Sequence, residues 1–148
     1  MDLNLLKATN RTAFLHIIFL LLLFFGFHST ADAKKKYPVI KFEQTTINLG
    51  TFTHDEAVQK CTFKFRNVGD APLVLNYVHT SCGCTIANYP KEPLPPGASG
   101  TISVTYDGSK KMPGPFRKSI QVYSNCKEDY NRLFIEGKMT ELVRENKK

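Results

Sequence analysis

The sequence predicts an all-β fold, and three observations support this prediction. Residues 58–66 alternate the apolar Cys61, Phe63 and Phe65 with polar or charged neighbours, as a strand does when one face is buried and the other is in water. From residue 37 onward, turn-forming residues recur roughly every eight to twelve positions. In the same part of the chain, no segment repeats its apolar residues with the 3.6-residue period of a helix. We therefore expect about seven short antiparallel strands in two facing sheets, a β-sandwich of immunoglobulin-like topology.

The same alternation places the individual strands along the chain. They are expected at residues 39–43, 47–52, 58–66, 73–78, 101–107, 116–124 and 132–138. Gly, Asp and Pro indicate a turn at 67–72, and Gly, Lys and Pro indicate a loop at 108–115. Four prolines between residues 90 and 97 exclude a central strand there, so this segment is expected to carry the chain from one sheet to the other.

The first residues have the pattern of a secretory signal peptide. Lys7 and Arg11 precede an uncharged apolar run at 12–27, and small residues follow as far as Ala33. We expect residues 1–33 to be a signal peptide cleaved after Ala33, with the remainder secreted or periplasmic and without a membrane span. An uncleaved signal anchor is the alternative, although the run is shorter than the ~20 residues of a comfortable span.

The remainder is expected to form one sandwich domain at 34–143, followed by a charged tail at 144–148. The chain has a formal charge of +7, but most of the excess lies in the basic ends, at 34–36 and 144–148. A nucleic-acid-binding domain would instead show a basic stripe interleaved with aromatic residues on a folded face. The distribution of charge therefore argues against a nucleic-acid partner.

Common catalytic motifs are missing from the sequence. It contains no H-E-x-x-H zinc motif, no G-x-S-x-G nucleophile elbow and no phosphate-binding loop. The adjacent carboxylates Asp55 and Glu56 are interpreted as a solvated turn, because neighbouring residues of an extended chain point to opposite sides. We therefore expect a protein that is not an enzyme and that requires no cofactor.

Several short motifs together resemble a known bacterial family. In order, they are L-G-T-F at 49–52, F-K-F-R-N-V-G at 63–69, P-L at 72–73, S-C-G-C-T at 81–85, P-G at 96–97, Gly114 with Phe116, S-N at 124–125 and I-E-G at 135–137. They resemble the family catalogued as domain of unknown function 1573, over nearly all of the sequence after the signal peptide. The resemblance implies an exported immunoglobulin-like domain akin to the Hydin and major sperm protein sandwiches, and it brings no established activity.

The four cysteines allow three disulfide pairings, which the sequence does not distinguish. Cys61 and Cys126 lie outside the family motifs. A bridge between them would close a long loop and stabilise the fold by about 4 kcal/mol, whereas a bridge between Cys82 and Cys84 would contribute roughly 1.6 kcal/mol. The first pair therefore suits a structural bridge, unless its members are two buried thiols that never meet.

The stretch Cys82-Gly83-Cys84 carries the most unusual chemistry and has three interpretations. The two cysteines can close or pack a tight turn, in which Gly83 adopts a positive φ or brings its neighbours close. They can form a reducible pair, because a small strained ring raises the reduction potential. With His79 or His54 they can also hold a soft metal such as Cu(I) or Zn(II), which takes thiolate and imidazole ligands.

From these features we expect an exported, non-catalytic binding or assembly module whose partner is another protein of the cell envelope. Edge strands of sandwiches can accept an extended segment of such a partner. The alternative function is thiol redox chemistry or copper or zinc binding at the Cys82-Gly83-Cys84 turn.

Overall fold

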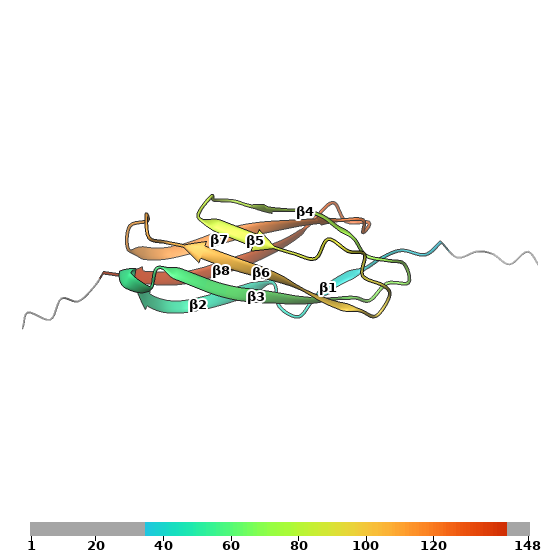
Figure 1. The fold of residues 1–148 in the computed structure, drawn as a ribbon, viewed down its shortest axis with the longest axis horizontal. Coiled ribbons are helices and arrows are strands. Elements are labelled where there is room, and N and C mark those ends of the chain that lie inside the picture. The colour runs from blue at the N-terminus through green and yellow to red at the C-terminus, as the bar shows by residue number, and fades with distance from the viewer. Residues whose placement is uncertain (1–34, 142–148) are drawn as a thin grey trace, which may run out of the picture. The chain divides into compact units, whose positions relative to one another are not determined.

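The computed structural model describes residues 35–141, which form two four-stranded β-sheets packed face to face (Figure 1). The predicted signal peptide at 1–33 and the charged tail at 144–148 lie outside the described residues. Within residues 35–141, none of the helices is long and apolar enough to cross a membrane.

Eight strands make up the sandwich, together with one turn of 3-10 helix, η1 (His54–Glu56). The strands are β1 (Ile40–Phe42), β2 (Thr46–Thr53), β3 (Val58–Asn67), β4 (Leu75–Thr80), β5 (Thr85–Asn88), β6 (Ser99–Asp107), β7 (Gly114–Ser124) and β8 (Asn131–Thr140). One sheet has the order β1-β3-β6-β5, and the other has the order β2-β8-β7-β4.

The predicted fold class is confirmed, and each of the seven predicted strands overlaps a strand of the structure. Two details differ from the prediction. The short strand β5 was not expected, and β2 pairs with β8 in the parallel direction, whereas the other five pairings are antiparallel. Both details depend on which distant segments meet, and the alternation within a strand carries no such information.

The prediction that the proline-rich segment crosses between the sheets is wrong. Strands β5 and β6, which flank this segment, belong to the same sheet. The chain changes sheets earlier, between β4 and β5, at the turn that contains Cys82 and Cys84. The prolines do keep the segment out of the ladder, and one of its contacts with the rest of the fold is an isolated bridge in which Leu73 and Leu94 exchange two 2.8 Å hydrogen bonds.

The core lies between the two sheets and is built from the inward-facing residues of the alternating segments. Completely or almost completely buried side chains include Phe63, Phe65, Ile102, Val104 and Tyr106 from one sheet and Ile120, Val122, Leu133 and Ile135 from the other. Tyr106 stacks on Phe116 of the opposite sheet, with ring centroids 4.2 Å apart. Burial of these side chains supplies the main driving force for the sandwich.

Asn67 is a buried polar residue that links the core to the proline-rich segment. Its amide group donates hydrogen bonds to the carbonyl oxygens of Ala71 (2.8 Å) and Leu94 (3.1 Å). Its Oδ1 accepts hydrogen bonds from the N–H groups of Gly69 (3.1 Å) and Val39 (3.4 Å). A side chain with no exposed surface thus satisfies four backbone groups and holds three chain segments together.

Candidate functional site

Two regions on the edge formed by β5 and β6 combine accessible surface with unusual chemistry. The first is the cysteine turn, which we define as residues 80–85. The second is the edge groove, which lies where β5 ends and β6 continues. The two regions flank the same four-residue strand.

In the cysteine turn, Cys82 and Cys84 are paired. Their sulfur atoms lie 2.00 Å apart and their Cα atoms 5.1 Å apart. The N–H of Cys84 also points at the sulfur of Cys82, at 3.1 Å. Both side chains are half-buried. The pair is therefore accessible from solvent while its backbone is held in place.

Backbone hydrogen bonds hold the turn independently of the sulfur atoms. The N–H of Ser81 donates to the carbonyl of Ser119 (3.0 Å), and the N–H of Ser119 donates to the hydroxyl of Ser81 (3.1 Å). The N–H of Thr85 donates to the carbonyl of Cys82 (3.0 Å). The carbonyl of Cys84 accepts a 2.7 Å hydrogen bond from the N–H of Asp107 in β6. The turn is thus attached to β7 on one side and to β6 on the other.

Of the two roles expected of Gly83, a positive φ is not adopted, whereas its neighbours Cys82 and Cys84 do lie close together. The glycines with positive φ are Gly50, Gly97 and Gly114. A Cβ atom built on Gly83 would have no atom within 4 Å beyond its chain neighbours. The turn therefore leaves open space around this position.

A pocket of about 370 Å³ lies beside the turn. It is lined by Cys82, Gly83, Cys84, Ile86, Thr105, Asp107, Lys110 and Lys111. The two lysines belong to the loop after β6, which is closed by a 2.8 Å hydrogen bond from the N–H of Lys111 to the carbonyl of Gly108. The carboxylate of Asp107 accepts hydrogen bonds from the hydroxyl and the N–H of Ser109, and these bonds lower the pKa of Asp107. Side chains of both charges surround the pocket, and the basic ones are in excess.

Neither of the two histidines considered as metal ligands is grouped with other potential ligands in the described part of the chain. His79 is exposed on β4, and its ring stacks on that of Tyr77 with centroids 6.2 Å apart. His54 belongs to η1, between β2 and β3. Among residues 35–141, no three His, Cys, Asp or Glu side chains are grouped closely enough to hold a metal ion. The geometry therefore gives no support to the interpretation as a soft-metal site.

Cys61 and Cys126 are both free thiols, so the alternative bridge between them is not formed in the structure. Cys61 lies opposite Val104 in the middle of the β3–β6 pair, where burial raises the pKa of its thiol. Cys126 follows β7, next to Asn125, whose N–H donates to the carbonyl of Val74. Both thiols are partly buried and pack against the core.

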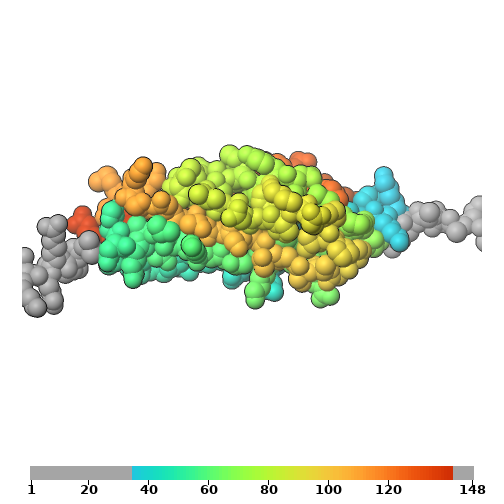
Figure 2. Space-filling view, in the orientation of Figure 1, coloured from blue at the N-terminus to red at the C-terminus, as the bar shows by residue number. Residues whose placement is uncertain are grey.

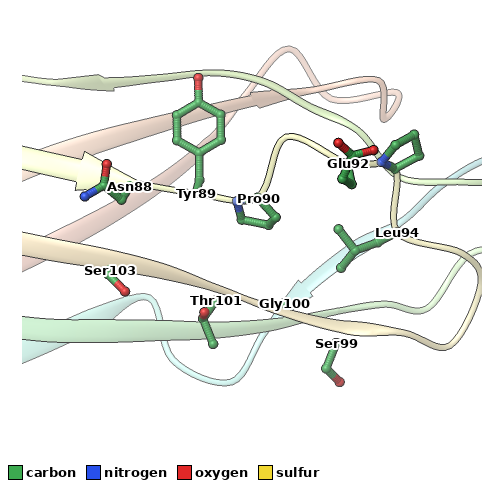
Figure 3. Close-up of a pocket in the computed structure, with 10 residues that line it drawn as sticks. Asn88, Tyr89, Pro90, Glu92, Leu94, Ser99, Gly100, Thr101 and Ser103 are labelled. Carbon is green, nitrogen blue, oxygen red and sulfur yellow. The ribbon is translucent and has the colours of Figure 1, made fainter.

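The edge groove arises because β5 is shorter than its neighbour. Strand β5 pairs with β6 from Thr85, opposite Tyr106, to Asn88, opposite Ser103. The chain then leaves the sheet, so within the described part of the chain residues 99–102 of β6 have a strand neighbour on the β3 side alone. A groove of about 520 Å³ occupies the space beside them (Figure 3), and the segment after β5 lies at the surface (Figure 2).

The groove exposes backbone groups that are able to form hydrogen bonds. In β6 the N–H of Asp107 is directed toward β5, because it donates to the carbonyl of Cys84. Successive residues of a strand direct their backbone N–H and C=O groups to alternate sides. Thr101 is an even number of residues from Asp107, so its backbone groups also face the β5 side, at a point that β5 no longer covers. The lining consists of hydroxyl, proline, tyrosine and leucine side chains, with Asn88 and Glu92 at the rim: it comprises Asn88, Tyr89, Pro90, Glu92, Pro93, Leu94, Ser99, Gly100, Thr101 and Ser103.

The walls of the groove are held firmly. Leu94 is fixed by Asn67 and by its bridge to Leu73. A Cβ on Gly100 would lie 2.6 Å from the ring of Phe65 and 2.9 Å from the side chain of Leu94, so glycine is required for this close packing. The groove is therefore formed before any ligand arrives. The groove could not be predicted from the sequence without β5, which was not expected although residues 85–88 are bounded by the cysteine turn and by Pro90.

A third accessible feature is a row of aromatic rings on the sheet that contains β4 and β7. Tyr77 is 55% exposed and lies against Tyr123, with ring centroids 6.1 Å apart. The rings of Tyr123 and Tyr130 have centroids 5.4 Å apart. The hydroxyl of Tyr130 accepts a 2.6 Å hydrogen bond from the guanidinium group of Arg132. This row lies on the other sheet from the edge groove.

The model of the family described as protein of unknown function DUF1573 matches residues 40–139. The chain belongs to the DUF1573 family. This confirms the resemblance seen in the short motifs. No curated protein matches the sequence.

Solved structures share the fold of this DUF1573 protein at low sequence identity. A protein of unknown function from Porphyromonas gingivalis W83 is 20% identical, with a TM-score of 0.63, and the match covers 75% of this chain and 51% of the other. The chain thus spans about half the length of that protein. A PapD-like domain of human CEP192 is 10% identical, with a TM-score of 0.57 and coverage of 70% and 86%. The periplasmic chaperone SfaE is 12% identical, with a TM-score of 0.52 and coverage of 71% and 59%.

Proposed function

We propose that this DUF1573 protein is an exported, non-catalytic binding or assembly module whose edge groove takes up an extended segment of another cell-envelope protein. The main support is the stretch of β6 at residues 99–102, which pairs with β3 but not with β5 and borders a groove of about 520 Å³ on that open side. Export is proposed from the pattern of the first 33 residues and agrees with a sandwich fold that the periplasmic chaperone SfaE shares.

The proposed ligand adds one short strand to the sheet. It runs antiparallel to β6, continues the line of β5, and exchanges hydrogen bonds with the backbone of Thr101. Its side chains then alternate between solvent and the apolar wall formed by Tyr89, Pro90 and Leu94. A segment with an apolar residue at alternate positions, and without proline where it meets Thr101, fits this description.

Binding assays with a library of decapeptides that alternate apolar and polar residues test the proposal. Thr101→Pro removes the N–H that faces the groove. We expect this substitution to weaken binding at least about tenfold, because one hydrogen bond to the buried ligand is lost. The matched variant Thr101→Val keeps that N–H and should bind like the wild type. Tyr77→Ala, on the opposite sheet, controls for binding to the row of aromatic rings.

Hydrogen exchange of the Thr101 amide provides a second readout that does not depend on the variants. The amide should exchange rapidly in the free protein and become protected when a binding peptide saturates the groove. If Thr101→Pro misfolds, Tyr89→Ala should still reduce affinity through loss of the apolar wall. Unchanged exchange at Thr101 in the saturated complex, or binding that only Tyr77→Ala abolishes, would exclude the groove as the site.

A further inference from the structure

We propose that Cys82 and Cys84 form a redox-active disulfide that oxidises pairs of cysteine thiols in extended segments of exported proteins. This activity goes beyond the proposed binding function and uses the opposite end of β5. It rests on the accessibility of the pair, the charges that surround it and the docking edge beside it.

The first argument is that this disulfide is poorly suited to a structural role. It closes a loop that spans only Gly83, so it removes little entropy from the unfolded chain. The turn is already attached to β7 through Ser81 and Ser119 and to β6 through Cys84 and Asp107. The backbone of the turn is therefore able to persist when the sulfur atoms separate, as a reversible redox reaction requires.

The second argument is that the surroundings stabilise a thiolate. Lys110 and Lys111 line the same pocket as both cysteines, and nearby ammonium groups favour the deprotonated sulfur. The N–H of Cys84 already points at the sulfur of Cys82 from 3.1 Å, and a charged acceptor strengthens such a bond. Asp107 is the acidic residue in the lining, and its carboxylate is engaged by Ser109. A thiolate that leaves the disulfide is thus stabilised from two directions.

The third argument is that a substrate has a place to dock. Strand β5 forms the edge of its sheet and begins immediately after the turn. Ile86 is 62% exposed on this strand and also lines the pocket. An extended segment that pairs with the free edge of β5 would bring its own cysteine to the disulfide.

The reaction is a thiol–disulfide exchange in two steps. A substrate thiolate attacks one sulfur of the Cys82–Cys84 bond, so a mixed disulfide forms and the other cysteine leaves as a thiolate. The second substrate thiolate then attacks the substrate sulfur of the mixed disulfide and releases the remaining cysteine. One S–S bond breaks in the turn and one forms in the substrate, and two electrons and two protons pass from the substrate to Cys82 and Cys84.

The first test equilibrates the purified full chain with mixtures of reduced and oxidised glutathione and counts thiols by alkylation and mass spectrometry. We expect Cys82 and Cys84 to change together, reversibly, within the range of these mixtures. Cys61 and Cys126 should remain thiols throughout. A pair that stays oxidised in every mixture, or four thiols after purification in air, would overturn the proposal.

The second test measures oxidation of a synthetic decapeptide that contains two cysteines. Cys82→Ser with Cys84→Ser should reduce the rate to that of spontaneous oxidation, and each single variant should identify which sulfur forms the mixed disulfide. Lys110→Ala with Lys111→Ala should slow the reaction at least about threefold, because the departing thiolate loses its nearby ammonium groups and becomes a poorer leaving group. Lys64→Ala, an exposed lysine on β3, is the matched control. Equal rates for the wild type and the double lysine variant would exclude the proposed role of the pocket.

Discussion

The two ends of β5 are built in opposite ways. At its start, the chain is closed by the Cys82–Cys84 pair and by backbone hydrogen bonds, yet a side chain added at Gly83 would meet nothing. At its end, the backbone of β6 at residues 99–102 has no strand neighbour on the β5 side, yet a side chain added at Gly100 would collide with Phe65 and Leu94. The first end thus has a hydrogen-bonded backbone with space around its glycine, and the second has an open backbone edge beside a tightly packed glycine.

This difference shows how one short strand can support two kinds of chemistry. A group that reacts with an incoming sulfur needs space around it and a backbone that survives the breaking of its bond. A groove that recognises backbone needs rigid walls, because a ligand that must order them loses affinity. If the two ends are independent, a substitution that disturbs one end should leave the properties of the other unchanged.

Asn67→Ala should have the largest effect, and it should act on the groove. The substitution leaves buried backbone groups, including the carbonyl of Leu94, without their partner, so we expect a loss of about 3 kcal/mol in the free energy of unfolding. Urea denaturation measures this loss, with Asn76→Ala, an exposed asparagine on β4 away from the groove, as the control. Peptide binding should weaken, while the glutathione equilibrium of Cys82 and Cys84 stays the same. A parallel change in that equilibrium would show that the two ends are coupled.

Gly100→Ala and Gly83→Ala compare the packing of the two ends with the same added methyl group. At Gly100 the new Cβ overlaps Phe65 and Leu94, and we expect about 2 kcal/mol of destabilisation. At Gly83 there is space, and we expect a change within about 0.5 kcal/mol. Thermal denaturation of both variants measures the difference. Equal losses would contradict the contrast in packing.

Cys82→Ser with Cys84→Ser measures how little the disulfide contributes to stability. Loop closure over so few residues predicts a loss of at most about 1.6 kcal/mol. The urea midpoint should decrease while the slope of the transition is unchanged. Reduction of the wild type with a phosphine should shift the midpoint by the same amount. A loss of 4 kcal/mol or more would assign the pair a structural role instead.

Asp107→Asn should have the smallest effect on stability, and this effect should appear only at acidic pH. Hydrogen bonds from Ser109 lower the pKa of Asp107 in the folded state, so the unfolded state binds a proton more readily. The resulting stabilisation is present above about pH 4 and is lost as the pH falls through the lowered folded pKa. The urea midpoint of the wild type should therefore decrease more steeply below pH 4 than that of Asp107→Asn. Identical acid profiles would show that the Asp107–Ser109 contact does not contribute.

Both the fold class and the faces of the strands could be predicted, but their pairing could not. The alternation of Phe63 and Phe65 with lysine and arginine identifies buried and exposed faces directly, because side chains of a strand alternate. Strand β5 has four residues and one large apolar side chain, Ile86, which is too little for a periodic signal. The edge groove follows from where β5 stops, and it was therefore missed.

The sequence singled out the cysteines of the turn as unusual chemistry, but it did not indicate which groups surround them. The family motif S-C-G-C-T singled out Cys82 and Cys84. The prolines, however, led to the wrong prediction that the chain crosses between the sheets at residues 90–97. The lysines that line the pocket come from the loop after β6, far along the chain from the cysteines. Nothing local to the motif indicates that they meet.

By itself, the sequence determined that this protein is a β-sandwich with two neighbouring cysteines, since alternation and residue chemistry are local properties. Only the tertiary structure decided that these cysteines lie where the chain changes sheets and that β6 continues beyond the end of β5. Those features depend on contacts between distant segments, and such contacts are selected by the packing of the whole core.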